Sequence, residues 1–106
     1  PSAVAELKDG RISTFTVSPG DVGLGLCKAG DLKGGDAAHN ATQLRAVLAG
    51  ARNAYRDVAA LNAAAALVVS GRAATLPDGF AMATASLDTG AAAKTLDRLV
   101  AVSSAA

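Results

Sequence analysis

The sequence predicts a mainly α-helical chain that opens with a β-hairpin and continues with four helices. Three observations support this fold class. Two short apolar runs flank Asp9-Gly10, and this dipeptide is the strongest local signal for a hairpin turn. Four later stretches carry apolar residues at helical spacing. Capping residues or glycines bound these stretches, and about a quarter of the residues are alanine, the strongest helix former.

Length and composition limit what the chain can be. With 106 residues it forms one domain at most. Aromatic residues are only 3% of the sequence, so an alanine-rich core buries little apolar area and the chain alone should be weakly stable. Its net charge of +1 argues against a nucleic-acid or anionic-membrane surface. One cysteine excludes an internal disulfide, and because no secretory segment opens the chain we expect a cytoplasmic location.

The hairpin is expected to have strands at 4–7 and 12–17. Two strands alone are barely stable in water, so this hairpin needs more sheet or a helix to lie on. A sheet partner upstream of Pro1 would supply it. Pro1 fits either the removal of an initiator methionine or the loss of an upstream segment, and the hairpin favours the second. A turn and a glycine-rich loop then fill residues 18–36.

The four helices are expected at 37–49, 54–71, 76–88 and 91–103. Asp36 and Thr75 are suitable N-caps, Gly50 is a suitable C′ residue, and Pro77 suits a first turn. The expected buried stripes, one helix after another, are Ala37, Ala41, Leu44, Val47 and Leu48; Ala54, Val58, Leu61, Ala65 and Val68; Leu76, Phe80, Ala83 and Leu87; and Ala92, Leu96, Leu99 and Val100.

The helix at 54–71 is the centre of the predicted fold. Its second face is apolar too, and a helix that is apolar all round is usually buried on every side. It is too short, and too interrupted by Asn62, to span a bilayer, which takes about 20 apolar residues. We therefore expect it to lie inside something larger than this chain builds alone. Leu61→Ala should cost about 2–5 kcal/mol, and Arg56→Ala, in the more polar first turn, under about 0.5 kcal/mol.

The best local candidate for chemistry is Lys28–Asp36, where two lysines and Gly-Gly precede a helix. This arrangement resembles an anion cradle. However, it lacks the Gly-Lys-Ser/Thr order of a phosphate-binding loop, and the Asp36 carboxylate would accept the N–H groups that a phosphate needs. A capped connecting loop is therefore the expectation.

The remaining polar residues show no reactive set. His39 has no ligands at metal-binding spacing and Cys27 has no Cys-x-x-Cys partner, so both are expected in structural or surface roles. Asn40 and Asn62 are expected to satisfy neighbouring backbone groups. The acids are scattered, without a carboxylate pair or a nucleophile–base set. We assign no catalytic, cofactor-binding or metal-binding residue to this chain.

Five phrases, at 4–10, 34–41, 44–50, 61–67 and 88–92, are together similar to the C-terminal part of the anthranilate phosphoribosyltransferase family. The resemblance covers the whole chain in order. It implies an α/β parent domain, of which residues 1–106 would be the C-terminal part, without the N-terminal helical domain and the catalytic loops. The parent would be a homodimer that binds phosphoribosyl pyrophosphate with Mg²⁺ and joins its ribosyl group to anthranilate, in tryptophan biosynthesis.

The resemblance assigns no functional residue here. The family's Gly-Thr-Gly-Gly-Asp loop, its Lys-His-Gly-Asn segment and its anthranilate-binding Arg have no counterpart, and Gly34-Gly35-Asp36 matches a different phrase. Pro1 corresponds to the Pro that follows the family's Mg²⁺-binding acid pair, so the Mg²⁺ ligands would lie upstream of residue 1. The expected partner is the missing N-terminal part of the same enzyme. Two alternatives stay open: a stand-alone helical module that binds a protein, or a related phosphoribosyltransferase or nucleoside phosphorylase with another substrate.

Overall fold

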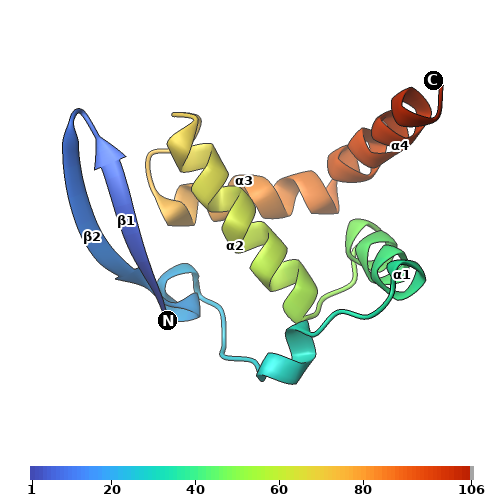
Figure 1. The fold of residues 1–106 in the computed structure, drawn as a ribbon, viewed down its shortest axis with the longest axis horizontal. Helices are drawn as coiled ribbons and strands as arrows, with labels where there is room; N and C mark the ends of the chain where they lie inside the picture. Colours follow the sequence, from blue (N-terminus) through green and yellow to red (C-terminus); the bar gives the residue numbers. More distant parts are fainter. Residues whose placement is uncertain (106) are drawn as a thin grey trace.

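A computed structural model describes residues 1–105, and it contains the predicted hairpin and four α-helices (Figure 1). The mainly α prediction is confirmed, and every helix begins and ends within about two residues of its predicted bounds. In chain order the elements are β1 (Ser2–Lys8), β2 (Arg11–Val17), the short 3₁₀ turns η1 (Pro19–Val22) and η2 (Ala29–Leu32), α1 (Ala37–Leu48), α2 (Ala54–Val69), α3 (Leu76–Asp88) and α4 (Ala91–Ser104).

The hairpin forms a two-stranded antiparallel sheet at one end of the molecule (Figure 1). Its turn residues, Asp9 and Gly10, both have positive φ values, 51° and 76°. This conformation matches the right-handed twist of the strands and explains why Asp-Gly is used there. Leu7 lies opposite Ile12, and the two residues are 72% and 75% exposed. The hairpin therefore leaves an apolar pair largely open to solvent.

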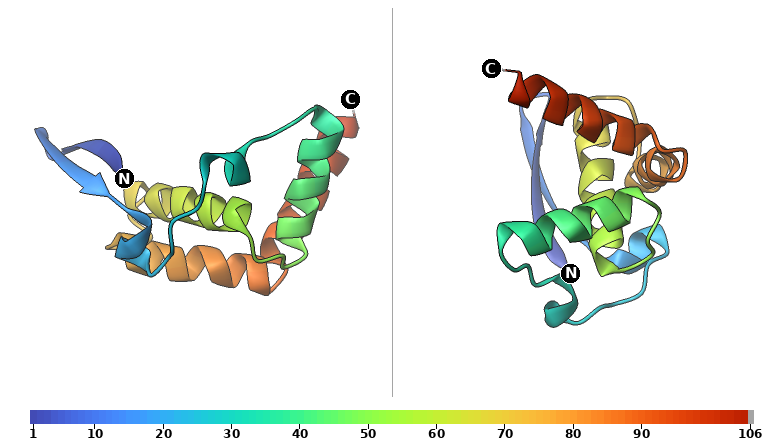
Figure 2. Two further views of the ribbon diagram at one scale, coloured as in Figure 1. Left: turned by 90° about the horizontal axis from the view of Figure 1, so that it is seen from below. Right: turned by 90° about the vertical axis from the view of Figure 1, so that its right-hand side faces the viewer.

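The centre of the molecule is the packed pair α2 and α3 (Figures 1 and 2). Small residues meet where the helices cross: Ala60 and Ala64 of α2 face Gly79 and Ala83 of α3, and all four are buried. A Cβ atom on Gly79 would lie 2.7 Å from the Ala64 carbonyl oxygen. The absence of a side chain at Gly79 is thus what permits this close approach.

The stripe predicted for residues 54–71 is correct only in part, because Ala54, Leu61 and Val68 are half-buried. The α3-facing residues of α2 are Arg56, Ala60 and Ala64, whereas Val58 is 38% exposed and Ala65 is exposed. The helix is not buried on every side within this chain, which agrees with the expectation that this chain alone does not enclose it. The physical reason is that almost every arc of α2 is apolar, so helical periodicity alone cannot select the face that packs.

The outer helices are less buried than predicted. In α1, Val47 is the buried residue, while Leu44 is 49% exposed; in α4, Leu99 and Val100 are 62% and 44% exposed. Both helices diverge from the central pair at its far end (Figure 2), so much of their apolar stripes has no partner in this chain. For α3 the prediction holds, since Ala83 is buried and Leu76, Phe80 and Leu87 are half-buried.

The buried apolar core of the described residues is small. It consists of Val47, Ala60, Ala64, Ala73 and Ala83, with no large side chain fully buried. Among residues 1–105 no helix combines the length and apolar character that crossing a bilayer requires.

Candidate functional site: an open apolar surface around α2

The loop before α1 is tied to itself and to α2, as a capped connection. Asp36 Oδ1 accepts a hydrogen bond from the His39 backbone N–H at 2.8 Å. The Asn40 amide brackets Gly35, with Oδ1 accepting from its N–H at 2.9 Å and Nδ2 donating to its carbonyl at 3.0 Å. The Tyr55 hydroxyl donates to the Lys33 carbonyl. The Asp36 carboxylate therefore caps α1 and the Asn40 amide holds Gly35, which confirms the predicted capped loop.

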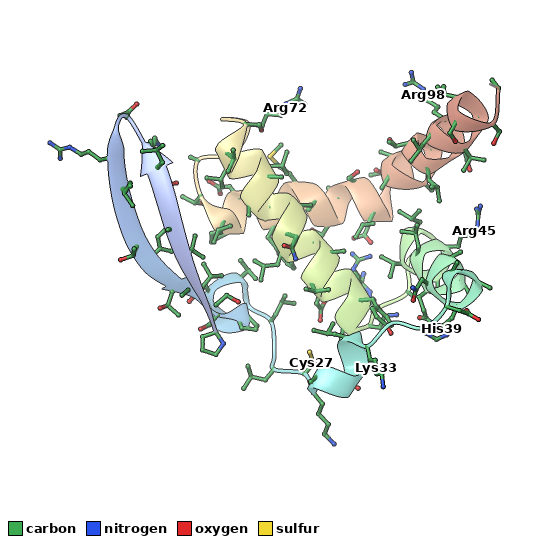
Figure 3. The ribbon with its side chains drawn as sticks, viewed as in Figure 1. Cys27, Lys33, His39, Arg45, Arg72 and Arg98 are labelled. Carbon is green, nitrogen blue, oxygen red and sulfur yellow. The ribbon has the colours of Figure 1, made fainter. Side chains whose placement is uncertain are left out.

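The candidate side chains are not brought together. Cys27 and Lys33 lie near the start of α2 and His39 lies on α1 (Figure 3); Cys27 and His39 are exposed. The imidazole of His39 covers Gly35, where a Cβ would lie 3.0 Å from the ring, so His39 packs on the loop as predicted. Residues 1–105 contain no group of three or more His, Cys, Asp or Glu placed to hold a metal. Their donor set does not fit a Mg²⁺ site, and the absence of catalytic residues stays a prediction.

Asn62 satisfies a neighbouring backbone group, as predicted, but on an exposed face. Its Nδ2 donates to the Val58 carbonyl one turn earlier, at 2.8 Å. Asn62 is therefore hydrogen-bonded within its own helix while its side chain remains accessible.

Arg56 is the residue that sequence reasoning missed. It is 3% exposed, and its Nη2 lies 2.8 Å from Asp88 Oδ1. The pair joins the first turn of α2 to the end of α3, over 32 residues of sequence. Nη1 is buried without a hydrogen-bond partner. The prediction that Arg56 lies in a polar first turn where substitution costs little is therefore wrong. The local sequence could not show that Asp88 approaches Arg56 in the fold.

Two shallow apolar grooves flank α2. The hairpin groove, between β1, β2 and α2, has a volume of about 410 Å³, and the α3 groove, between α2, α3 and the start of α4, about 700 Å³. The hairpin groove is lined mainly by Val4, Phe15, Leu61, Ala65, Val68 and Val69. The α3 groove is lined mainly by Ala59, Ala63, Ala66, Leu67, Met82 and Leu87.

The surface between the two grooves is uncharged. No charged residue lies between Asp57 and Arg72, and Asn62 is the polar side chain on the outward arc of α2. The chain exposes 7424 Å², whereas a compact protein of 10.3 kDa exposes about 5,400 Å². The excess of roughly 2,000 Å² is larger than one partner's share of a standard protein interface, about 800 Å².

These features define a class of protein segment. A small alanine core and open apolar faces among residues 1–105 are the properties of an interior piece of a larger fold. The profile of the family described as "Glycosyl transferase family, a/b domain" matches residues 1–93. The chain belongs to this glycosyl transferase family.

Curated relatives are similar along nearly the whole chain. The "Anthranilate phosphoribosyltransferase" of Methylobacterium nodulans is 59% identical over 105 residues, which are 99% of this chain and 31% of that protein. The protein of the same name from Xanthobacter autotrophicus is 62% identical over 100 residues, 94% of this chain and 29% of its own length. The chain thus spans about three tenths of the relatives that it matches, and the family resemblance seen in the sequence is confirmed.

Proposed function

We propose that this chain is the C-terminal segment of an anthranilate phosphoribosyltransferase. Such an enzyme transfers the phosphoribosyl group of phosphoribosyl pyrophosphate to the anthranilate nitrogen and releases pyrophosphate. The observation that carries the proposal is the identity of 59–62% to relatives that share this one name, over 94–99% of the chain.

In this proposal the segment supplies structure to the enzyme and leaves substrate chemistry to the rest of the chain. It would form the C-terminal part of the α/β domain, with the helical domain and the catalytic loops outside residues 1–106. The family is described as an a/b domain, whereas the described residues contain only a two-stranded hairpin. The other strands of such a domain would therefore come from outside this chain. A parallel sheet needs helices on both faces, and the open faces of α2 suit that role.

Further properties of the complete enzyme belong to the same proposal. We propose that it requires Mg²⁺, held by residues outside this chain, since the residues here do not fit a Mg²⁺ site. We also propose a homodimer, a cytoplasmic location and a role in tryptophan biosynthesis. The last follows from anthranilate as acceptor.

A chimera tests the proposal. In the Methylobacterium nodulans enzyme, the segment matched by this chain is replaced with residues 1–105, and the formation of phosphoribosyl anthranilate is measured. We expect activity within about tenfold of the unmodified enzyme, because a segment that only supports the fold should be exchangeable among relatives at this identity. The unmodified enzyme and one that lacks the segment are the controls.

A chimera that is folded and monodisperse but inactive would overturn the proposal. The alternative of another acceptor is tested on the full-length protein that contains this segment. Turnover with a nucleobase or a nucleoside, and none with anthranilate, would assign it to a related phosphoribosyltransferase or nucleoside phosphorylase.

A further inference from the structure

The turn of the hairpin carries an inference that does not depend on the proposed function. An aspartate followed by glycine can cyclise, because no side chain on the glycine hinders the approach of its nitrogen to the aspartate carboxyl group. The chain contains this dipeptide twice, at 9–10 and at 78–79. We propose that Asp9-Gly10 is a modification site, at which aspartate converts spontaneously to isoaspartate, whereas packing protects Asp78-Gly79 from the same reaction.

The reaction needs only the two residues and water. The Gly10 nitrogen bonds to Cγ of the protonated Asp9 carboxyl group, and the carboxyl hydroxyl leaves as water with the amide proton. Water then opens the resulting five-membered imide at one of its two carbonyl groups. Breaking the bond from the nitrogen to Cγ restores aspartate. Breaking the bond from the nitrogen to the main-chain carbonyl carbon of Asp9 leaves isoaspartate, and no oxidant or reductant takes part.

The first Asp-Gly site is open and unrestrained. Asp9 and Gly10 are exposed at the tip of the hairpin, away from the helices (Figures 1 and 2). A Cβ atom on Gly10 would meet nothing within 4 Å, so there is free space around the attacking nitrogen. Among residues 1–105, neither the Gly10 N–H nor the Asp9 carboxylate makes a hydrogen bond. Ring closure therefore requires only a rearrangement of the turn.

The second Asp-Gly site is held in place. Asp78 is exposed too, but Gly79 is buried against α2, where a Cβ atom would lie 2.7 Å from the Ala64 carbonyl oxygen. The Gly79 N–H donates to the Thr75 carbonyl at 3.0 Å, in the first turn of α3. The Asp78 N–H donates to Thr75 Oγ1 at 3.2 Å. The imide can close here only after this turn unwinds and Gly79 leaves α2.

Isoaspartate would alter the hairpin although the mass and the number of carboxyl groups stay the same. The main chain gains one atom at the turn, because the Cβ atom of Asp9 becomes part of it. The turn joins the paired residues Lys8 and Arg11, and a two-residue turn sets the register of a hairpin. The modification therefore removes the turn geometry on which the strand pairing depends. The product is also the kind of residue that isoaspartyl carboxyl methyltransferases recognise.

Ageing of the folded chimera described above tests the proposal. The protein is kept for weeks in warm, mildly acidic water enriched in heavy oxygen, with and without urea. Peptides are then separated and analysed by mass spectrometry with electron-transfer fragmentation, which distinguishes isoaspartate from aspartate. Each passage through the imide adds one heavy oxygen to the residue. The control variant is Asp9→Gly, which removes the carboxyl group and keeps a Gly-Gly sequence suited to this turn.

We expect isoaspartate to form at least about tenfold faster at position 9 than at position 78 in the folded chimera, because only the second site must first unfold locally. In urea the two rates should agree within about threefold, since both sites are then open. Amide hydrogen exchange over residues 2–17 should be faster in the aged protein than in the fresh protein. The Asp9→Gly variant should show no such change with age.

Equal rates at the two positions in the folded chimera would overturn the proposal, and so would the absence of isoaspartate and heavy oxygen at position 9. If the chimera does not fold, the same comparison is made on the full-length protein that contains this segment. A folded chimera that isomerises at position 9 but transfers nothing to anthranilate would sink the proposed function and leave the modification site intact. An active chimera that stays unmodified at position 9 would sink the modification proposal alone.

Discussion

Arg56 is buried where the start of α2 meets the end of α3, with its one ion pair directed at the half-exposed Asp88. Two electrostatic features favour the guanidinium there. Asp88 supplies a full negative charge, and the last turn of a helix carries partial negative charge on its carbonyl groups. Because Arg56 is 3% exposed, little water reaches its guanidinium while Asp88 is in place. The pair is therefore expected to matter more than a surface salt bridge, which contributes about 0–1 kcal/mol.

The first prediction concerns this pair. Asp88→Ala in the chimera should lower the free energy of unfolding by about 1–3 kcal/mol, because it leaves a buried charged donor unsatisfied. The urea midpoint of unfolding measures the loss. Asp97→Ala, an exposed aspartate in α4, is the matched control and should change the free energy by under about 0.5 kcal/mol. Equal midpoints for the two variants would contradict the role of Asp88.

At the scale of elements, α2 and α3 are held close by the lack of a side chain at Gly79. Alanine normally favours a helix over glycine by about 1 kcal/mol. Here the new Cβ would meet the Ala64 carbonyl oxygen at 2.7 Å and its Cα at 3.0 Å. These are backbone atoms, so the two helices must move apart to relieve the contact.

The second prediction is that Gly79→Ala destabilises the chimera by about 1–3 kcal/mol, the usual cost of overpacking. Gly25→Ala is the control, since a Cβ there meets nothing within 4 Å. It should be neutral or stabilising by up to about 1 kcal/mol. Urea unfolding of both variants measures the difference, and a stabilised Gly79→Ala variant would show that the helices are free to separate.

Local signals explain most of what the sequence predicted correctly about the elements. The Asp9-Gly10 turn fixes the hairpin, and the N-caps Asp36 and Thr75 accept hydrogen bonds from His39 and Asp78 backbone N–H groups. Such signals involve residues within a few positions of each other. They need no knowledge of the tertiary fold, so the order and bounds of the elements are predictable.

Packing depends on partners that are distant in sequence or outside this chain. The inward face of α2 was predicted only in part because apolar residues surround the helix, and the choice of Ala60 and Ala64 depends on where α3 lies. The Arg56–Asp88 pair was missed for the same reason. For the candidate site, the loop before α1 was predicted correctly from its own residues. The sequence also indicated that α2 needs more cover than this chain provides, but the faces of α2 that stay open could be assigned only when its neighbours were placed.

At the scale of the whole molecule, the third prediction concerns ligand binding by the isolated chain. Residues 1–105 show no group of side chains placed to hold a metal, and the Asp36 carboxylate at the start of α1 would repel a phosphate. We therefore expect no binding of phosphoribosyl pyrophosphate with Mg²⁺ in calorimetry at millimolar ligand. The complete Methylobacterium nodulans enzyme is the positive control. Mg²⁺-dependent binding by the isolated chain would show that a ligand site lies in this segment.

The last prediction concerns the folded state of the isolated chain. Its radius of gyration is 15.3 Å, against about 13 Å for a compact domain of this length, and its core holds four alanines and one valine. Burial of so few apolar atoms should not offset the entropy of ordering the chain. Open sheet edges and apolar patches are also sites of association. Alone, the chain should therefore associate instead of forming a cooperative monomer.

Sedimentation at tens of micromolar tests this expectation, with two variants of matched exposure. Val69→Lys changes an apolar residue at the end of α2 that is 88% exposed, and Leu26→Lys changes a loop residue that is 86% exposed. Because association should proceed through the open apolar faces of α2, Val69→Lys should lower the weight-average mass and Leu26→Lys should leave it unchanged. If the unmodified 106-residue chain is monomeric and has a sharp thermal transition, the prediction is refuted and a stand-alone binding module is favoured. Equal effects of the two lysines would instead mean that the chain associates without using α2.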